Sequence, residues 1–318
     1  MRRARVQARA ASHGGLCASA EGVTRRRHGV PARSTGIADE LIVRALLGAL
    51  VAGVVSIAGR QAGSLSPSGH WAAFVLGTVV VSAGWEWGAL LIAYFLSASM
   101  LTQLGQARKA ARTESMLPVQ SARNAWQVNA NGSVFATLML LGEFTGDPWL
   151  LVAGLGALAA AAADTWATEI GTLWGGAPRS ILTGRIVPAG ASGGVTLVGS
   201  AASVVAATLM ALAAYGLFAL RARDSASPAL AMPLAVLLAV LLGGIGGSLG
   251  DSVLGATLQS KRWCAQCRTW TERKVHTCQY RTRHASGLRW MTNDTVNLLA
   301  TVLGAALAFL LMVTFTSR

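Results

Sequence analysis

Charged residues are scarce in this sequence of 318 residues. Asp, Glu, Lys and Arg make up 13% of the chain, whereas a soluble domain of ordinary composition has about 25%. The mean hydropathy is +0.49, and several uncharged runs reach the roughly 20 residues that a helix needs to cross a bilayer. One soluble core cannot bury so many such runs, so the composition excludes a soluble globular protein.

Familiar nucleotide and nucleophile motifs are absent as well. The sequence has no G-x-x-x-x-G-K-[ST] loop, no kinase-type Gly-rich loop and no G-x-S-x-G, so any nucleotide is bound in an unconventional way. No ten-residue alternation of apolar and polar residues predicts a β-barrel. The 36 Gly instead favour closely packed membrane helices. We therefore predict an all-α fold, a polytopic transmembrane helical bundle.

Acidic residues are fewer than basic ones, 13 against 27, which gives a net charge of +14. The basic residues lie in the N-terminal tail and in the loops between apolar runs, as the positive-inside rule expects of a membrane protein. We therefore predict a lipid bilayer, and no nucleic acid, as a partner. The basic loops could also attract a phosphorylated substrate.

Residues 1–38 differ in composition from the rest of the chain. They hold eight Arg and one acidic residue, Glu21, and they lack the apolar core of a secretory signal peptide. An Arg-rich, Ser-containing, acid-poor start is typical of an organelle transit peptide. A disordered basic tail or a misplaced start codon would have the same composition. Residues 39–318 are predicted to form a single transmembrane domain.

Apolar runs predict about seven membrane spans, within a range of six to eight. The runs occupy residues 41–58, 71–104, 133–163, 193–220, 229–250 and 295–315. The run 71–104 is too long for one straight span and is interrupted at Gly84, so it forms either two short spans or one span with a re-entrant half. In both cases the polar loops, residues 105–132, 164–192 and 259–290, face the same side.

Acidic residues enter the apolar runs at three places. Asp164 and Glu169 follow one run, Asp251 lies in a stripe of small and polar residues that includes Ser248, and Asp294 begins the last span. Ionisable groups at such depths are costly and usually functional. Neighbouring carboxylates can hold Mg²⁺, which prefers oxygen ligands and substrate phosphates. The alternatives are solvated helix ends, N-caps and a packing stripe, although packing does not need Asp251.

Amide side chains form two further polar stripes at helical spacing. Asn293 and Asn297 are one turn apart at the start of the last span, and Gln127 and Asn131 follow Arg123 at intervals of four residues. Such stripes can bind a ligand or can form hydrogen bonds between helices, and the sequence does not decide between the two.

Basic residues flank two of the motifs. Arg179 and Arg185 precede a Gly- and Pro-rich segment that leads into a span, and Lys261 follows the stripe around Asp251. Exposed backbone N–H groups ahead of a helix can bind phosphate, and arginines add charge-assisted hydrogen bonds. A Gly- and Pro-rich loop before a span is also common without any ligand.

The basic loop at residues 259–290 contains Cys264, Cys267, His276 and Cys278. C-x-x-C is a normal zinc half-site, so these four residues could bind Zn²⁺. The second half, H-x-C, is tight, and three cysteines in one loop do not make a disulfide framework.

Taken together, these segments resemble the membrane family that contains phytyl-phosphate kinase of plants and cyanobacteria and animal transmembrane protein 19. The matching stretches follow the family's order: the segment near residue 101, residues 123–132, 164–171, 185–194 and 247–259, the Cys/His loop, and residues 293–297. The resemblance implies transfer of the γ-phosphoryl group of a nucleoside triphosphate to an isoprenyl monophosphate. In chlorophyll-bearing organisms this substrate would be phytyl phosphate, for tocopherol and phylloquinone synthesis, in a chloroplast membrane if residues 1–38 are a transit peptide.

Phosphoryl transfer needs positioning and charge neutralisation more than covalent catalysis. We therefore predict Asp164, Glu169 and Asp251 as Mg²⁺ ligands, with Asp294 and Asn293 supporting the metal or the substrate. Basic, amide and hydroxyl side chains would hold the phosphates, namely Arg179, Arg185, Lys261, Gln127, Asn131, Ser248 and Asn297. The G-D-S…K-R segment faintly resembles CTP-using lipid kinases and CDP-diacylglycerol synthases, which suggests CTP, or a loose choice of nucleotide, as the donor.

Three other functions fit parts of the pattern. A transporter also uses Gly-broken helices with intramembrane carboxylates, and Asp251 at the middle of the bilayer would favour it. A CTP-dependent cytidylyltransferase-like lipid enzyme would share the nucleotide site. A non-catalytic scaffold would leave the carboxylates unexplained.

Overall fold

The computed structural model describes residues 33–117, 122–224 and 233–316 of the chain. Most of the predicted tail, residues 1–32, therefore lies outside the described residues. The first helix already begins at Arg33, so the tail ends before the predicted boundary at residue 38.

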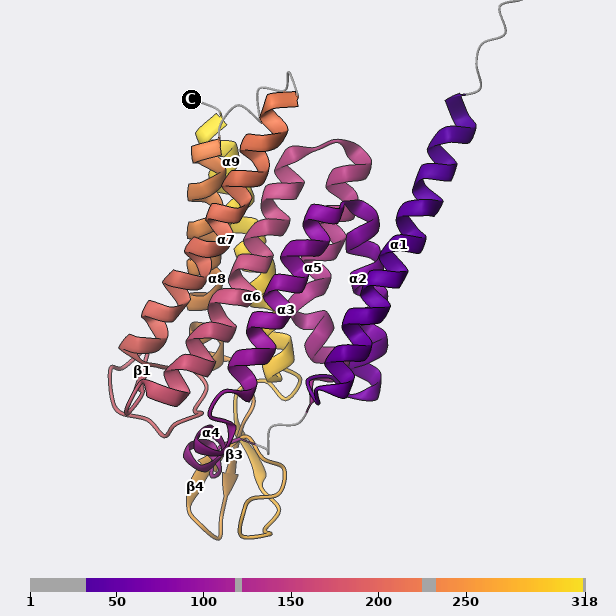
Figure 1. Ribbon diagram of the computed structural model, residues 1–318. Coiled ribbons are helices and arrows are strands. Elements are labelled where there is room, and N and C mark those ends of the chain that lie inside the picture. The colour runs from indigo at the N-terminus through magenta and orange to yellow at the C-terminus, as the bar shows by residue number, and fades with distance from the viewer. Residues whose placement is uncertain (1–32, 118–121, 225–232, 317–318) are drawn as a thin grey trace, which may run out of the picture.

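The described chain is mainly helical. Its helices are α1 (Arg33–Gln61), α2 (Pro67–Ala83), α3 (Trp85–Gln103), α4 (Gln106–Thr113), α5 (Ala125–Thr145), α6 (Pro148–Trp174), α7 (Leu197–Asp224), α8 (Pro233–Thr257) and α9 (Asn293–Thr316). The long helices lie side by side in one bundle (Figure 1). The predicted all-α polytopic bundle is confirmed.

Two small antiparallel sheets, which the sequence did not predict, lie in the loops. Strands β1 (Arg179–Ser180) and β2 (Gly194–Val195) pair within the Gly- and Pro-rich segment. Strands β3 (Lys261–Cys264), β4 (Thr269–Thr271) and β5 (Arg283–Ser286) form a three-stranded sheet in the order β4–β3–β5. The basic Cys/His loop is therefore a small folded unit.

Local sequence signals set the helix boundaries. Asn124 accepts a hydrogen bond from the backbone of Gln127, whose side chain in turn binds the Asn124 backbone, so a complete capping box begins α5. Asp147 caps α6 in front of Pro148, which occupies the first helical position. Both devices satisfy backbone N–H groups that a helix start leaves unpaired.

Five helices of the described chain are long and apolar enough to cross a membrane, and six if the bent pair α3–α4 counts as one span. Six is the lowest number of spans that the sequence predicted, and five lies below that range. The run 71–104 forms two helices that meet at Gly84. The remaining bundle helices are α2, which has 17 residues, and α5, whose first turns carry Gln127, Asn129 and Asn131.

Helix α6 is the centre of the bundle. It packs against α3, α5, α7, α8 and α9, and every residue from 151 to 163 is buried. This stretch is largely alanine, so neighbouring backbones approach closely. The approach is closest among α6, α8 and α9, where a Cβ on Gly304 would lie 2.8 Å from the Gly156 oxygen and one on Gly243 would lie 2.7 Å from the Gly304 oxygen.

The polar loops gather at one end of the bundle. Figure 1 shows α4, the β1 region and the β3–β4 region together at the lower end, whereas α1 starts and α9 finishes at the upper end. The predicted placement of all three basic loops on one side is therefore confirmed. We call this the loop end of the bundle.

A cluster of charges ties the opposite end together. Arg221 of α7 forms ion pairs with Glu86 of α3 and Glu143 of α5, the latter at 2.8 Å. Its guanidinium also lies over the ring of Trp87, 4.8 Å from the centroid, and the Trp87 indole donates to Glu143 at 2.8 Å. The cluster thus joins three helices.

We predict that Gly304→Ala lowers the free energy of unfolding by about 1–3 kcal/mol, the usual cost of overpacking. The added methyl group would meet Ala160 and the Gly156 oxygen. Unfolding in mixed micelles of rising SDS content measures the effect. The matched control is Gly216→Ala, because a Cβ there meets nothing within 4 Å; equal stability of the two variants would contradict the packing argument.

Candidate active site

Two carboxylates from different helices face each other near the loop end. Asp164 of α6 and Asp251 of α8 lie within hydrogen-bonding reach of each other. They lie ten and six residues before the ends of their helices, about 15 Å and 9 Å along the helix axes. Both side chains are partly buried, and two carboxylates so close together repel each other unless a cation lies between them or one of them is protonated.

Helix α9 adds two amides to the pair. Asn293 lines the same cavities as the two aspartates. In the orientation that gives both of its amide atoms partners, Asn297 donates to Asp251 Oδ2 at 3.0 Å and to the Asn293 carbonyl oxygen at 3.2 Å. Asn297 therefore positions Asp251 and also lines the larger cavity, and the phosphate-binding role suggested by the sequence stays a prediction.

The carboxylate pair lies between two polar cavities. The larger cavity has a volume of about 560 Å³, and the smaller one about 230 Å³. Both are lined by Asp164, Thr168, Asp251 and Asn293. A ligand in either cavity can therefore reach the same carboxylates.

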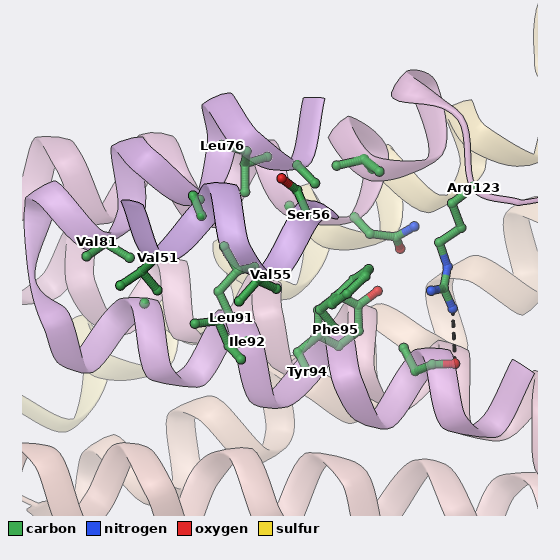
Figure 2. Close-up of a pocket in the computed structure, with 18 of the residues that line it drawn as sticks. Val51, Val55, Ser56, Leu76, Val81, Leu91, Ile92, Tyr94, Phe95 and Arg123 are labelled. Carbon is green, nitrogen blue, oxygen red and sulfur yellow. Dashed lines mark hydrogen bonds between the residues drawn. The ribbon is translucent and has the colours of Figure 1, made fainter. Parts of the chain in front are cut away.

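The larger cavity joins an apolar groove between α1, α2 and α3, which is shown in Figure 2. Aliphatic and aromatic side chains line the groove, among them Val51, Val55, Leu76, Val81, Leu91, Ile92 and Phe95. Tyr94, Arg123, Gln127 and Asn131 line both spaces. The predicted stripe of Arg123, Gln127 and Asn131 therefore lies where an apolar space meets a polar one.

Arg123 is held in place by three hydrogen bonds to α3. Its guanidinium donates to Ser99 Oγ at 3.0 Å, to the Ala98 oxygen at 3.1 Å and to Thr102 Oγ1 at 2.9 Å. Figure 2 shows the side chain at the polar end of the groove. These bonds fix the plane of the guanidinium, which prepares it for an anion.

The smaller cavity is walled by the glycine-rich segment at residues 189–196. Arg112 of α4 lines it and donates to the backbone oxygens of Leu173 and Gly176. The predicted Ser248 also lines it and accepts a hydrogen bond from Ser203 at 3.1 Å. Backbone N–H groups beside a cation are a suitable environment for phosphate.

Glu272, which follows β4, closes the smaller cavity. Its carboxylate accepts a hydrogen bond from Ser192, which ties the glycine-rich segment to the Cys/His unit. Burial raises the pKa of Glu272 above its usual value. Burial also lowers the pKa of Lys261, whose ammonium donates to the Ala256 oxygen at 2.7 Å.

Glu169 lines the larger cavity together with Asp164 and Asp251, but its hydrogen bonds go to other residues. Its two oxygens accept from Lys109 at 2.5 Å and from Thr102 at 2.6 Å. Lys109 donates also to the backbone oxygens of Leu101 and Thr102. Glu169 therefore anchors α4 against α3 and α6, and its role as a ligand of Mg²⁺ stays a prediction.

Other predicted residues lie outside the two cavities. Arg179 and Arg185 are exposed in the β1 region, and Arg179 donates to the Gly184 oxygen at 2.9 Å. Asp294 is partly buried in the first turn of α9. None of the three, nor Lys261, lines either cavity. The four Cys and His residues come together in the sheet unit, outside both cavities.

Several residues of the site were missed in the sequence. Lys109 and Arg112 stand in a basic loop, where the positive-inside rule already accounts for every basic residue. Tyr94 and Thr102 lie in an apolar run, and Glu272 lies in the Cys/His loop. Only the helical spacing of Lys109 and Arg112 could have marked them as one face of a helix.

The sequence of this chain is similar to that of several known membrane proteins. The family model "Integral membrane protein DUF92" matches residues 50–305. Protein PGR of Arabidopsis thaliana is 30% identical over 236 residues, which cover 70% of this chain and 81% of that protein. The uncharacterized membrane protein sll0875 of Synechocystis is 27% identical over 247 residues, 77% of this chain and 81% of its own. "Protein VTE6, chloroplastic" of A. thaliana is 26% identical over 252 residues, 78% of this chain and 65% of its own. No solved structure matches the chain.

We predict that Lys109→Met destabilises the protein by about 3–5 kcal/mol, as is usual when a buried ion pair loses one partner. Glu169 and two backbone oxygens would lose their donor. SDS-dependent unfolding measures the loss. The neighbouring Arg108→Met is the control, because Arg108 is exposed; an unchanged stability of Lys109→Met would mean that this ion pair does not anchor α4.

Proposed function

Since the chain belongs to the integral membrane family DUF92, we propose that it is a membrane-embedded kinase that converts an isoprenyl monophosphate to its diphosphate. The observation that carries the proposal is that Arg123 lines both the apolar groove and the larger cavity, and that Asp164 and Asp251 line the same larger cavity. A lipid with a phosphate head needs an apolar space for its chain and, next to it, a polar space with a cationic side chain for its phosphate.

The isoprenyl chain would occupy the groove of Figure 2. The groove is lined by branched aliphatic side chains and Phe95, and burial of a hydrocarbon chain stabilises binding by about 0.8 kcal/mol for each CH₂. Its walls are bundle helices, so the substrate can enter from the bilayer in which it is dissolved.

The phosphate of the substrate would lie in the larger cavity beside Arg123. Gln127 and Asn131 line the same junction and can donate hydrogen bonds from their amides. Because three protein oxygens already hold the guanidinium of Arg123, the phosphate meets a cation that needs little reordering.

Asp164 and Asp251 would hold Mg²⁺ between the two substrates. Their facing carboxylates, with the amide of Asn293 nearby, supply the hard oxygen ligands that this ion prefers. Mg²⁺, when bound, would neutralise the phosphates of the donor. Asn297 would fix the rotamer of Asp251 through the bond to Oδ2.

The nucleoside triphosphate would extend from the smaller cavity. Arg112 and the backbone N–H groups of residues 189–196 line that space and would bind the phosphates. In the reaction, an oxygen of the isoprenyl phosphate attacks the γ-phosphorus, and the bond between that phosphorus and the β,γ-bridging oxygen breaks. The products are the isoprenyl diphosphate and a nucleoside diphosphate. The attacking oxygen is already ionised, so no general base is required.

The most specific form of the proposal has phytyl phosphate as the acceptor, in a chloroplast membrane. It rests on the resemblance to the phytyl-phosphate kinase family and on the relationship to a chloroplastic protein of A. thaliana. CTP, or another nucleoside triphosphate, would be the donor.

The position of Asp251 favours an enzyme over a transporter. It lies six residues before α8 ends and six residues after the middle of this helix, so it is on the loop-end side of the middle. A donor and an acceptor that enter from water and from lipid can meet at such a place.

We predict that Asp251→Asn abolishes diphosphate formation, because one carboxylate can no longer compensate the metal charge. The purified protein in nanodiscs is incubated with phytyl phosphate and ATP, CTP, GTP or UTP in turn, and the product is measured by mass spectrometry. Asp147→Asn is the matched control, since Asn caps a helix as well as Asp. Wild-type turnover by Asp251→Asn would reject the site, and no product from the wild type with any donor would reject the function.

A second prediction tests the groove. Val55→Trp should raise the KM for phytyl phosphate at least about tenfold, equivalent to 1.4 kcal/mol, because the indole fills the space between α1 and α3. The KM for dimethylallyl phosphate, whose chain is short, should change little. Val54→Trp is the control, since Val54 is 62% exposed on the other face of α1. Equal changes in the KM of both acceptors would show that the isoprenyl chain of the substrate binds elsewhere.

A further inference from the structure

The Cys/His unit at the loop end has a centre of unusual composition. It is a three-stranded sheet of short strands, and its buried residues include Cys264, Thr271, His276 and Thr282. Its larger apolar side chains, such as Trp270 and Val275, are exposed. A unit of this size cannot be stabilised by such a core alone and needs a cross-link or a metal.

We propose that Cys264, Cys267, His276 and Cys278 bind one structural zinc ion that holds this unit together. The ligand atoms of the four residues all lie within 4.8 Å of one another. Cys264 Sγ is 3.6 Å from Cys278 Sγ, and His276 Nδ1 is 3.4 Å from Cys278 Sγ. A tetrahedral site with Zn–S bonds of about 2.3 Å places its sulfurs about 3.8 Å apart, so the spacing of the ligand atoms is close to that of a zinc site.

The backbone bends sharply beside two of these ligands. Arg268 and Gln279 are the non-glycine residues with positive φ among those described, at 50° and 63°. Each directly follows a proposed ligand, Cys267 and Cys278 respectively. Left-handed conformations cost about 1–2 kcal/mol for an ordinary residue, and such strain gathers at ligand clamps. Two strained residues in these positions are explained if the turns wrap a metal.

The histidine is prepared for coordination as well. His276 is 4% exposed, and its Nε2 is buried with no hydrogen-bond partner among the described residues. Its Nδ1 faces Cys278. As the ring is oriented, Nδ1 faces the cysteines. If the ring were flipped, Nε2 would face them, so either orientation presents a nitrogen to a metal.

A disulfide does not explain the cluster. Cys264, Cys267 and Cys278 are all free, and a disulfide would use two of three cysteines and leave His276 without a role. Three thiolates and one imidazole form a common ligand set for structural zinc, with all four positions filled by the protein. The site therefore has no open position for catalysis.

Zinc at this place would stabilise one wall of the smaller cavity. Thr271 Oγ1 donates to the Met116 oxygen at 3.1 Å, and the Glu272 backbone N–H donates to the same oxygen at 2.9 Å. Arg273 donates to the Glu114 oxygen at 2.7 Å. The sheet unit is thus joined to the segment after α4, and Glu272 reaches Ser192 from it.

The test measures the metal directly and does not depend on the proposed activity. The full-length protein, purified in detergent without chelator, should contain about one zinc ion per chain, measured by inductively coupled plasma mass spectrometry. After exchange for Co²⁺ it should show the visible d–d bands of a tetrahedral site and a thiolate charge-transfer band. Cys267→Ser and His276→Ala should each lose at least about tenfold in zinc affinity, measured by competition with a chromophoric chelator.

Matched substitutions serve as controls. Cys17→Ser changes a cysteine outside the described residues, and His284→Ala changes another histidine of the same unit, so both should keep the metal. Because Cys267 is exposed, its replacement should leave the bundle folded. Wild-type protein that contains no stoichiometric metal and gives no tetrahedral cobalt spectrum would overturn the proposal. So would a mass 2 Da below the reduced chain, which would reveal a disulfide within the cluster.

Discussion

The proximity of Asp164 and Asp251 is the constraint on which the rest of the structure depends. Two carboxylates within hydrogen-bonding reach repel each other in a medium of low dielectric constant, so the helices that carry them must be held together by other contacts. Gly244 and Gly304 let α8 and α9 approach the backbone of α6, and the alanines of α6 leave no large side chain between them. Dispersion among these close surfaces opposes the repulsion, and a cation removes it.

Around this pair, several polar groups that line the larger cavity are also held by hydrogen bonds to the surrounding helices. Glu169 is bound by Lys109 and Thr102, and Asn297 is turned toward Asp251. Arg123 is bound on one side by α3 and faces the cavities on the other. A rigid support for each charged group limits the reorganisation that binding requires, which is how a site of few residues can bind highly charged ligands.

The sequence predicted the parts of this site that stand out against apolar surroundings. Asp164 and Asp251 are conspicuous because a carboxylate in a long apolar run is costly, and the spacing of C-x-x-C marked the Cys/His unit. The ion pair of Glu169 was not predicted because its partner Lys109 lies 60 residues earlier, and no local pattern links the two. The sheet was missed because strands of three or four residues show no periodicity. The number of spans was uncertain for α2 and α5, which are respectively short and polar at the start.

The apolar groove, the larger cavity and the smaller cavity form a series, and each is linked to the next by residues that line both. Tyr94 and Arg123 belong to both the apolar groove and the larger cavity, Asp164 and Asp251 belong to both cavities, and Glu272 joins the smaller cavity to the Cys/His unit. A lipid that enters from the bilayer and a nucleotide that enters from the water would therefore meet at the carboxylates without crossing each other's path. If the proposed function holds, the phosphates would need no separate nucleotide-binding domain, because the helix ends and the glycine-rich segment already surround the place where they would meet. The Cys/His unit lies at the loop end of the series, where the proposed zinc ion would stabilise one wall of the smaller cavity.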